Sequence, residues 1–434
     1  MKSPLKIFYT AGPGDVIGTY KYWVRGEDDP SQVSITYSSQ FYDVCRQLNA
    51  QGYVVSSSNK KGFYQDEQFT IEHIPIPLQQ AGGILYHLGF LWYGLRIIFM
   101  AIRFRADVAI ISSGTTHWFI LSLLPWFGIQ VIPSLHCVLW SEYIPITTTQ
   151  KLFLDWSENL FTKGALCILS ISEDIDKNVK AITGRANLPI KNFLPVYREK
   201  DFEGIQQPDL NASPKRVLFV GRIEKNKGVF DLLKIATRFL AENRQNVRFD
   251  ICGDGSQLDL LKEAAIAAKV DSFFVCHGHC NKTTLREMFD RSHLFIIPTQ
   301  KDFLEGFNKV VVEGVLAGRP IVTSSVCPAL YYVSKAASEV PPGDVEAYGS
   351  AVEKLCDDPD FYREKQRSCA EYQHNFFALS RSWGETLKSA LEDWEKSKRK
   401  VNLYSSQGVC GLRDSNQREI PNQATRKIKA RIPN

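Results

Sequence analysis

The chain has 434 residues and a formal net charge of +5, with 44% apolar and 23% charged residues. It is too long for one typical domain, so two hydrophobic cores are expected, and its composition excludes a disordered chain. Ten scattered cysteines, with no secretory leader before the first apolar strand, favour a reduced cytoplasmic setting over a disulfide scaffold.

The first half of the chain alternates apolar strands with amphipathic helices. A strand at 6–11 runs into a glycine-rich turn at 12–18. Further strands are predicted at 53–55, 70–76, 108–111, 130–134 and 167–170. Helices are predicted at 38–51, at 84–104, at 117–127 and from residue 173, where Ser172 is the expected cap. This alternation predicts a parallel, doubly wound sheet.

Polar, proline-containing sequence between residues 195 and 214 predicts a linker, and the alternation then restarts. Strands are predicted at 216–220, 247–252, 273–275, 294–298 and 321–323. Helices are predicted at 228–242, 258–268, 283–291, between 305 and 318, at 344–355 and, as the last amphipathic segment, at 383–394. We therefore expect a second α/β domain and a ligand cleft between the two.

The helix at 84–104 is nearly as long as a membrane span, but charged and polar side chains interrupt it. A spanning helix just before the buried strand at 108–111 would also be topologically awkward, so the main interpretation is a core helix of the first domain. The alternative is an aromatic and basic surface that rests on lipid. Its residues would be Tyr86, Phe90, Trp92, Tyr93, Arg96, Arg103 and Arg105.

The charge is concentrated at the C-terminus. Residues 396–434 hold ten Lys and Arg against Asp414 and Glu419, a net charge of +8. With few apolar residues, this segment is expected to be disordered, and attraction to an anionic membrane is its alternative role.

Two carboxylates, Glu305 and Glu313, stand eight residues apart around a glycine turn and a short helix that ends at Gly318. Unpaired amides and the positive end of the dipole make such a helix start a phosphate site. A rise of 1.5 Å per residue puts the carboxylates about 12 Å apart. A ligand touching both must be elongated, with an anion in the middle and hydroxyl groups at each end. A sugar nucleotide has that shape.

Upstream, the strand at 216–220 leads into Gly221, Arg222 and, five residues later, Lys227. Because parallel strands end at the ligand crevice, both cations are expected to point into it, where they could neutralise a diphosphate. The next two strands end in glycine turns at Gly253 and Gly278. The turn at Gly253 either allows the backbone to approach a nucleotide closely or is a plain tight turn.

In order and spacing, these four segments resemble glycosyltransferase family 4, retaining GT-B enzymes that use nucleotide sugars. The resemblance implies that Arg222 and Lys227 hold the donor diphosphate. It implies that Glu305 contacts the donor sugar and Glu313 the ribose. The amides of Gly306, Phe307 and Asn308 would lie near the sugar and phosphate. Asn308 departs from the family's glycine and would narrow the pocket or add a polar contact.

The first half matches the family more loosely. Gly12 and Gly14 follow the first strand, where the family has a glycine-rich loop close to the donor phosphate and acceptor. His136 ends a strand that resembles the family's histidine segment, so the resemblance places it against the donor sugar. His117 is a second choice. The family's usual segment at the end of this domain is replaced by residues 194–198, so the hinge contact must differ.

Other chemistries fit the sequence less well. A zinc site is not expected in Cys276-His277-Gly278-His279-Cys280, because four ligands within five residues are too crowded for tetrahedral zinc. Asp174 and Asp176 imitate the D-x-D element of metal-dependent transferases, but they are predicted inside a helix and not at the end of a strand. The separation of Glu305 and Glu313 exceeds hydrolase geometry, and the first glycine loop fits a dinucleotide fingerprint poorly. A catalytically silent sugar-nucleotide binder, acting as a partner or regulator of a glycan pathway, stays as the alternative function.

We therefore predict a GT-B fold with two Rossmann-like domains, at 1–199 and 200–379, a crossover helix at 380–397 and a basic tail at 398–434. The predicted activity is retaining, metal-independent transfer of a hexose-type sugar from a nucleotide-diphosphate donor to an acceptor hydroxyl. Glu305, His136, Arg222 and Lys227 are the candidate catalytic residues. No cofactor or metal is expected, and the acceptor would be a carbohydrate or a lipid-linked molecule. The setting expected from the family is the cytoplasm, with the inner membrane face as an alternative.

Overall fold

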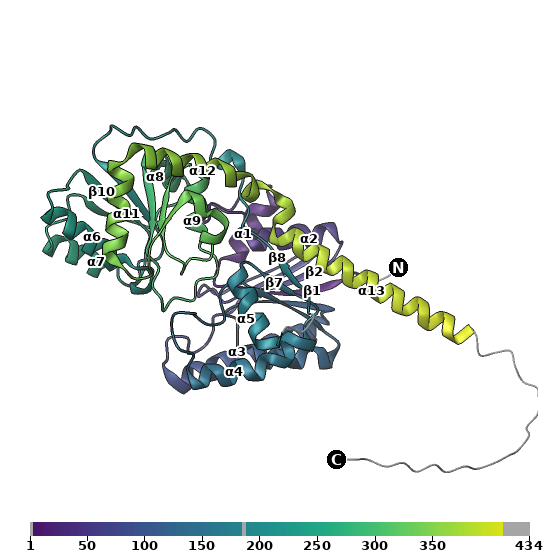
Figure 1. The fold of residues 1–434 in the computed structure, drawn as a ribbon. Helices are drawn as coiled ribbons and strands as arrows, with labels where there is room; N and C mark the ends of the chain where they lie inside the picture. Colours follow the sequence, from purple (N-terminus) through teal and green to yellow (C-terminus); the bar gives the residue numbers. More distant parts are fainter. Residues whose placement is uncertain (1–2, 185–187, 411–434) are drawn as a thin grey trace, which may run out of the picture. The chain divides into compact units, whose positions relative to one another are not determined.

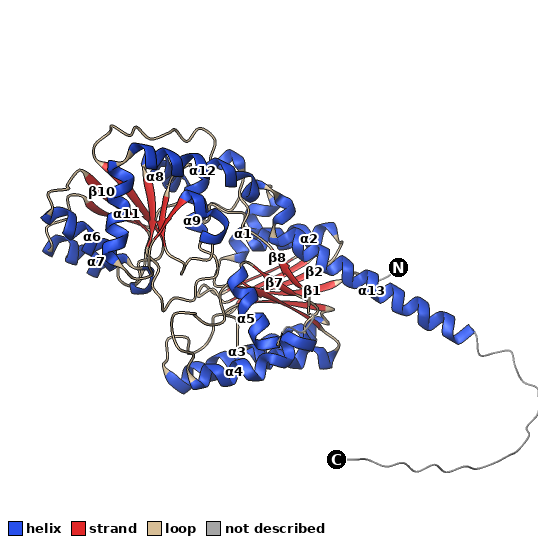
Figure 2. Cartoon of the chain, in the orientation of Figure 1, coloured by secondary structure: helices blue, strands red, loops and turns tan. Residues whose placement is uncertain are grey.

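The computed structural model describes residues 3–184 and 188–410, with side chains described through Arg399. Its strands form two separate, mainly parallel sheets with helices packed on them, as Figure 2 shows. The first sheet has eight strands and the second has six. The first sheet ends at Asn192 and the second begins at Lys215, so the boundary predicted near residue 199 falls in the connection between them.

The first sheet has the strand order β3-β4-β2-β1-β5-β6-β7-β8, and only β3 is antiparallel to its neighbour. Its central strands read as continuous apolar runs because helices cover both faces. The strands are β1 (Lys6–Ala11), β2 (Gln51–Ser56), β3 (Gly62–Gln65), β4 (Phe69–His73), β5 (Val108–Ser112), β6 (Gln130–Leu135), β7 (Ile168–Ser170) and β8 (Ile190–Asn192).

The helices of this half are partly those that were predicted. They are α1 (Val16–Val24), α2 (Tyr37–Gln47), α3 (Gly83–Phe104), the 3₁₀ helix η1 (Trp118–Phe127), α4 (Thr148–Asn159) with the π turn η2 (Leu160–Gly164), α5 (Glu173–Thr183) and the short 3₁₀ turn η3 (Glu199–Asp201). The helix α3 buries Phe90, Ile97 and Ala101 in one cluster with Phe8 and Ala109 of the sheet. By length and composition alone α3 could cross a membrane, yet 44% of its most apolar 18-residue stretch is buried inside the protein.

The second sheet has the order β11-β10-β9-β12-β13-β14, with every pairing parallel. The strands are β9 (Lys215–Val220), β10 (Val247–Cys252), β11 (Phe274–Gly278), β12 (Leu294–Ile297), β13 (Ile321–Thr323) and β14 (Ala337–Glu339). The order reverses between β9 and β12, and ligands of open α/β sheets bind at the carboxyl ends of the strands at such a switch point.

The helices of the second half are labelled in Figure 1 where there is room. They are η4 (Lys225–Lys227), α6 (Val229–Ala241), α7 (Leu258–Ala267), α8 (Lys282–Arg291), α9 (Lys309–Leu316), α10 (Leu330–Val333), η5 (Ser334–Ala336), α11 (Val345–Asp357), α12 (Pro359–Phe377) and η6 (Leu379–Arg381). The apolar faces of α6, α7 and α11 meet the sheet around Phe219, Phe249 and Ile296, which are fully buried or nearly so.

The last helix, α13 (Trp383–Cys410), begins on the first sheet. The indole N–H of Trp383 donates to Ser134 Oγ of β6 at 2.8 Å, and the amide of Gly384 donates to Gln40 Oε1 at 2.8 Å. Contacts divide the chain into a unit ending at Lys388 and a second from Ser389 onward, so the rest of α13 is described by itself. It continues to Cys410, past the predicted end at residue 394, because no glycine or proline follows residue 394 before Gly408.

Two local predictions were wrong. The glycine-rich turn ends at Asp15 rather than at Gly18, because the Asp15 carboxylate accepts the Gly18 amide at 2.8 Å and starts α1 there. Ser172 stands at the N-cap position of α5, but its side chain makes no capping bond. Part of the predicted tail, residues 398–410, is helical, and residues 411–434 lie outside the described residues.

Candidate active site

The glycine turns at the ends of β9, β10 and β11 lie against one another. The Gly221 amide donates to Cys252 O at 3.0 Å, and the Gly253 amide donates to Gly278 O at 2.8 Å. A Cβ on Gly253 would lie 1.7 Å from Gly221 O, and its φ of +149° favours glycine. The three predicted turns therefore form one rim along the carboxyl edge of the second sheet.

The predicted cations stand beside this rim. Lys227 Nζ lies 2.6 Å from Glu305 Oε2, with side chains only 13% and 11% exposed. Lys227 Nζ is also 3.6 Å from the centre of the Phe303 ring, and the Arg222 guanidinium is 5.5 Å from it. Arg222 itself is exposed. Both cations and Glu305, separated by about eighty residues in sequence, thus meet around Phe303.

The departure at Asn308 has a structural explanation. Asn308 precedes the first turn of α9 with φ 71° and ψ 88°, a left-handed conformation that glycine adopts freely and asparagine tolerates. Its side-chain amide donates to Glu305 Oε2 at 3.0 Å. The asparagine therefore keeps the backbone turn and adds a second donor to the carboxylate that Lys227 already binds.

His136 of the first domain meets the glutamate loop through Gly306. A Cβ on Gly306 would lie 1.9 Å from the backbone oxygen of His136, so only glycine fits at this contact. The backbone contact brings His136 next to the loop that carries Glu305, as the sequence analysis expected of these residues.

Of the two ring nitrogens of His136, only Nε2 has a hydrogen-bond partner among the described residues. Ser134 Oγ lies 2.9 Å from His136 Nε2 and accepts the indole N–H of Trp383, which leaves the Ser134 proton for Nε2. Burial, with a smaller effect from Lys309, lowers the pKa of His136 to about 3, so the ring is neutral at neutral pH. Its proton then sits on Nδ1, which is buried and has no partner among the described side chains.

Glu313 lies one turn into α9, four residues after Lys309, and is only 6% exposed. Burial raises its pKa to about 7 and lowers the pKa of Lys309, on the same face of the helix, to about 8. The Tyr197 hydroxyl, from the segment that replaces the family's usual hinge, donates to the Lys309 backbone oxygen at 3.3 Å. Lys309 Nζ donates to Ser34 Oγ at 2.9 Å. The contact between Glu313 and a ribose stays a prediction.

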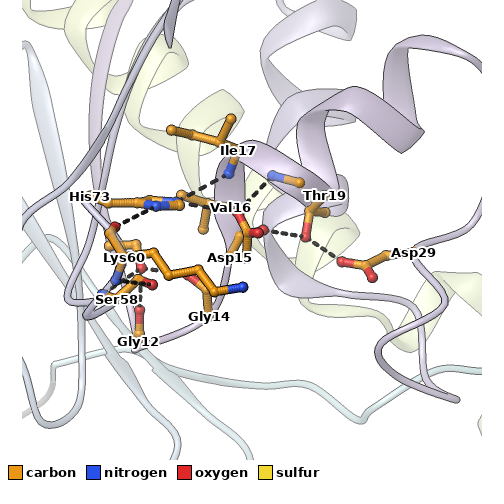
Figure 3. A network of polar contacts seen from close by, with 12 residues as sticks. Gly12, Gly14, Asp15, Val16, Ile17, Thr19, Asp29, Ser58, Lys60 and His73 are labelled. Atoms are coloured by element: carbon orange, nitrogen blue, oxygen red, sulfur yellow. Dashed lines mark hydrogen bonds and ion pairs between the residues drawn. The ribbon is translucent and has the colours of Figure 1, made fainter. Parts of the chain in front are cut away.

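Gly12 and Gly14 lie at the start of α1 within a network of polar contacts (Figure 3). The Ser56 hydroxyl lies 2.9 Å from Gly12 O and 2.5 Å from Gly14 O. His73 accepts the Ile17 amide at Nε2 (3.3 Å) and approaches the Lys60 carbonyl with Nδ1 (3.0 Å). Nothing lies within 4 Å of a Cβ built on either glycine, so the loop borders open space. Its predicted contact with the donor is not shown.

Residues that were set aside have partners of their own. Asp174 pairs with Lys177 at 2.7 Å, and Asp176 Oδ2 accepts from Asn192 at 2.9 Å. His277 Nε2 lies 2.7 Å from Asp250 Oδ1.

The second-choice residue His117 points to His87, with 3.1 Å between His87 Nδ1 and His117 Nε2. Both line a cavity of about 780 Å³ that also contacts Arg222 and Phe303. This cavity therefore borders the candidate cations.

The sequence analysis missed four residues that shape the site. Ser134 and Trp383 hold His136, Phe303 lies under the cations, and Lys309 is partly buried beside Glu313. Ser134 stands two residues before His136, which directly follows β6 in chain order, so the alternation of the strand puts both side chains on one side and this signal was readable. Nothing in the sequence relates Trp383 to a strand 249 residues earlier.

Comparison with known proteins finds a family match in the second half of the chain. Residues 201–376 match the family model described as "Glycosyl transferases group 1". A glycogen synthase of Mycobacterium tuberculosis is 29% identical over 162 residues, 37% of this chain and 38% of the relative. A 2-deoxystreptamine N-acetyl-D-glucosaminyltransferase of Niallia circulans is 29% identical over 143 residues, 32% of this chain and 36% of the relative. These matches span well under half of each relative.

Solved structures match over nearly the whole chain. Sucrose-phosphate synthase from Thermosynechococcus elongatus has a TM-score of 0.65 at 13% identity, covering 92% of this chain and all of that one. Anabaena HepE in complex with UDP-glucose has a TM-score of 0.61 at 14% identity, covering 90% of this chain and all of that one. At such identities the likeness concerns the fold, which is GT-B as predicted.

Proposed function

We propose that this chain, whose residues 201–376 match the family model of the group 1 glycosyltransferases, moves a hexose-type sugar from a nucleotide-diphosphate donor to an acceptor hydroxyl with retention of configuration and without a metal. The observation that carries the proposal is the meeting of Lys227, Arg222 and Glu305 around Phe303, beside the glycine rim of the second sheet. Anabaena HepE, with the same fold, binds UDP-glucose, which supports a nucleotide sugar as the donor.

The charges suit departure of a diphosphate. Arg222 and Lys227 place two positive charges next to the amino end of α9, whose free amides and dipole also favour an anion. As the bond to the sugar breaks, negative charge grows on the departing phosphate, and these fixed groups stabilise it without reorganising. They supply the charge that a divalent cation supplies in other transferases.

The sugar would be oriented by hydrogen bonds from both domains. Glu305 exchanges its contacts with Lys227 and Asn308 for donor-sugar hydroxyls, and His136 offers the unpartnered Nδ1–H. Because His136 is neutral, it adds no positive charge beside the developing oxocarbenium carbon. We infer front-face attack by the acceptor, assisted by the departing phosphate.

The same proposal assigns the enzyme to polysaccharide or glycolipid assembly at the cytoplasmic side of a membrane. The outer face of α3 supports a membrane contact, since it carries exposed apolar side chains and no acidic residue. Arg96 and Arg103 on this helix are exposed and suit an anionic lipid surface. The exposed apolar residues are Ile84, Leu85, Leu88, Trp92, Leu95 and Phe99.

A panel of nucleotide sugars tests the proposal. The donor should raise the melting temperature, and transfer should continue in EDTA with the anomeric configuration of the donor kept in the product. Lys227→Ala and Arg222→Ala should each lower kcat by roughly 10²–10³-fold, the usual cost of removing one charge-stabilising donor. Lys225→Ala, an exposed cation of the same turn, is the matched control. Normal turnover in both site variants would refute the assignment.

A further inference from the structure

We propose that the 780 Å³ cavity bounded by α3, η1, α4 and Phe303 is the acceptor site, and that it takes an amphiphile, a saccharide carried on an apolar chain. The inference rests on the proposed function and names the acceptor class for the same site. Three observations carry it: the position of the inner end, the character of the wall, and the surface onto which the wall leads.

The inner end of the cavity adjoins the donor groups. Ser113 and Gly114 follow β5, Cys137 follows β6, and these carboxyl ends face Arg222 and Phe303 across the cavity. Since Phe303 also packs under Lys227, a hydroxyl group at this end lies beside the cations proposed to hold the diphosphate. This is where an acceptor alcohol must stand to reach the sugar carbon.

The wall beyond is more apolar than its composition suggests, because three of its polar side chains bond within the protein. Thr116 Oγ1 donates to Phe90 O at 2.6 Å, Gln150 Nε2 to Leu139 O at 3.2 Å, and Ser157 Oγ to Phe153 O at 2.6 Å. Among the described residues no carboxylate lines the cavity. A sugar chain along this wall would find few partners for its hydroxyls, whereas an alkyl chain needs none.

Aromatic rings form a continuous path from the cavity to the surface. The ring of His117 lies 4.5 Å from that of Phe153, and Phe153 lies 5.9 Å from Trp156, which is 53% exposed. Burial, with a smaller effect from His87, lowers the pKa of His117 to about 4, so this part of the path carries no charge at neutral pH. An apolar chain could follow these rings outward.

The path ends on the apolar surface already described. Both α3 and α4 pack on η1, so their exposed apolar side chains belong to neighbouring elements. The first turns of α3 expose Ile84, Leu85 and Leu88, and α4 exposes Leu152 beside Trp156. A chain leaving the cavity at Trp156 therefore meets the surface proposed to face lipid. Cavity and surface together fit one molecule with a polar head and an apolar tail.

Alkyl glycosides test the inference by binding alone. Methyl and octyl β-D-glucoside, both below the micelle concentration, are titrated into the full chain and followed by saturation-transfer NMR. The octyl glycoside should bind at least tenfold tighter, and Phe153→Ala should abolish this preference. Trp156→Ala, at an exposed position, should weaken the preference for the octyl glycoside, and it replaces Phe153→Ala as the test if that variant does not fold. Phe63→Ala, which removes a 62% exposed ring of β3, should leave it unchanged.

The variant Trp92→Ala distinguishes binding in the cavity from adsorption of detergent to the surface. It removes an exposed ring of α3 outside the cavity and should leave the preference for the octyl glycoside unchanged. Equal binding of the two glycosides, or equal losses in the Phe153, Phe63 and Trp92 variants, overturns the inference. Failure of the proposed function looks different: no nucleotide sugar binds and no sugar is transferred, while the octyl preference and its loss in Phe153→Ala persist.

Discussion

Position 308 requires a residue that tolerates a left-handed backbone, and its side chain also hydrogen-bonds the Glu305 carboxylate. Its left-handed φ of 71° penalises most residues, but asparagine tolerates it and donates to the Glu305 carboxylate at 3.0 Å. From the family's glycine at this position, the sequence predicted only that Asn308 narrows the pocket or adds a polar contact. Only the coordinates reveal that the asparagine amide reaches back three residues instead of pointing into open space.

Two substitutions separate these contributions. Asn308→Gly removes the amide and keeps the turn, so stability should be almost unchanged while the donor dissociation constant rises several-fold. Asn308→Ala removes the amide and also strains the backbone, which should cost about 1 kcal/mol more than Asn308→Gly. Chemical denaturation and donor titration measure both. Equal stability of the two variants would mean that the turn relaxes without penalty.

The buried carboxyl of Glu313 links stability to pH. Its pKa is raised from 4.5 to about 7 in the folded chain, so between these values the folded chain holds a proton that the unfolded chain has lost. The free energy of unfolding should therefore fall as pH rises through this window, by up to about 3 kcal/mol. Lys309 changes little there, since its folded pKa is about 8.

Glu313→Gln should remove this pH dependence, because glutamine does not titrate. Urea denaturation of wild type and variant at pH 5 and pH 7.5 measures the difference. Glu364→Gln, an exposed glutamate of α12, controls for the loss of one carboxylate. Parallel pH profiles for wild type and Glu313→Gln would contradict a buried, proton-holding carboxyl at this position.

Individual residues show how far sequence reasoning reached. It placed Arg222, Lys227 and Glu305 together because strand ends and a helix start converge at one edge of a parallel sheet. It could not predict that Lys227 and Glu305 pair directly at 2.6 Å, or that Lys309 donates to Ser34, because both depend on side-chain positions in three dimensions.

At the scale of elements, the start of α9 and the end of β6 are joined by a backbone contact. Gly306 approaches the His136 carbonyl so closely that an added Cβ would lie 1.9 Å from its oxygen. Because the obstacle is backbone, no rotamer change relieves it. The loop carrying Glu305 and the strand carrying His136 must therefore separate if a side chain is introduced.

Gly306→Ala should consequently lower kcat/KM by at least tenfold with little change in the melting temperature of either domain, since the displaced loop lies at their junction. A misplacement of about 1 Å is enough for losses of this size. Gly82→Ala, a glycine with open space around it and no positive φ, is the control. Unchanged kcat/KM in Gly306→Ala would show that this contact is not needed in the working enzyme.

Elements also set the limit of pattern reading. The β–α alternation predicted most strands and the long helices because burial on both faces produces continuous apolar runs. It missed α4, whose exposed face mixes Leu152 and Trp156 with charges, so the helical period is blurred. The family resemblance implied that the last helix crosses back to the first domain, but it did not identify the pair of Trp383 and Ser134, which no local pattern encodes.

At the scale of the whole molecule, the helix α3 has one face buried against the first sheet and one apolar face exposed. One face of α3 fills the core with Phe90, Ile97 and Ala101, and the opposite face exposes rings such as Trp92, which is 64% exposed. The predicted core helix and the predicted lipid-facing surface are therefore two faces of one helix, and the sequence alternatives need not exclude each other. Phe90 and Tyr93, however, belong to the buried face.

Liposome co-sedimentation measures the exposed face directly. The full chain should bind vesicles containing anionic phospholipid, and raising the salt concentration should weaken binding. Arg96→Glu combined with Arg103→Glu should remove the salt-sensitive part, about 1 kcal/mol for each basic residue near the surface. Trp92→Ser combined with Phe99→Ser should weaken binding at every salt concentration, because it removes buried apolar area.

Deletion of residues 411–434 distinguishes the helix from the tail. That segment carries six of the ten basic residues counted from Lys396 onward and both acidic ones, a net charge of +4. If α3 provides the contact, the shortened chain keeps its dependence on Trp92 and Phe99 and loses only part of the salt-sensitive binding. Binding that disappears with the deletion, while the α3 variants behave as wild type, would assign membrane contact to the tail.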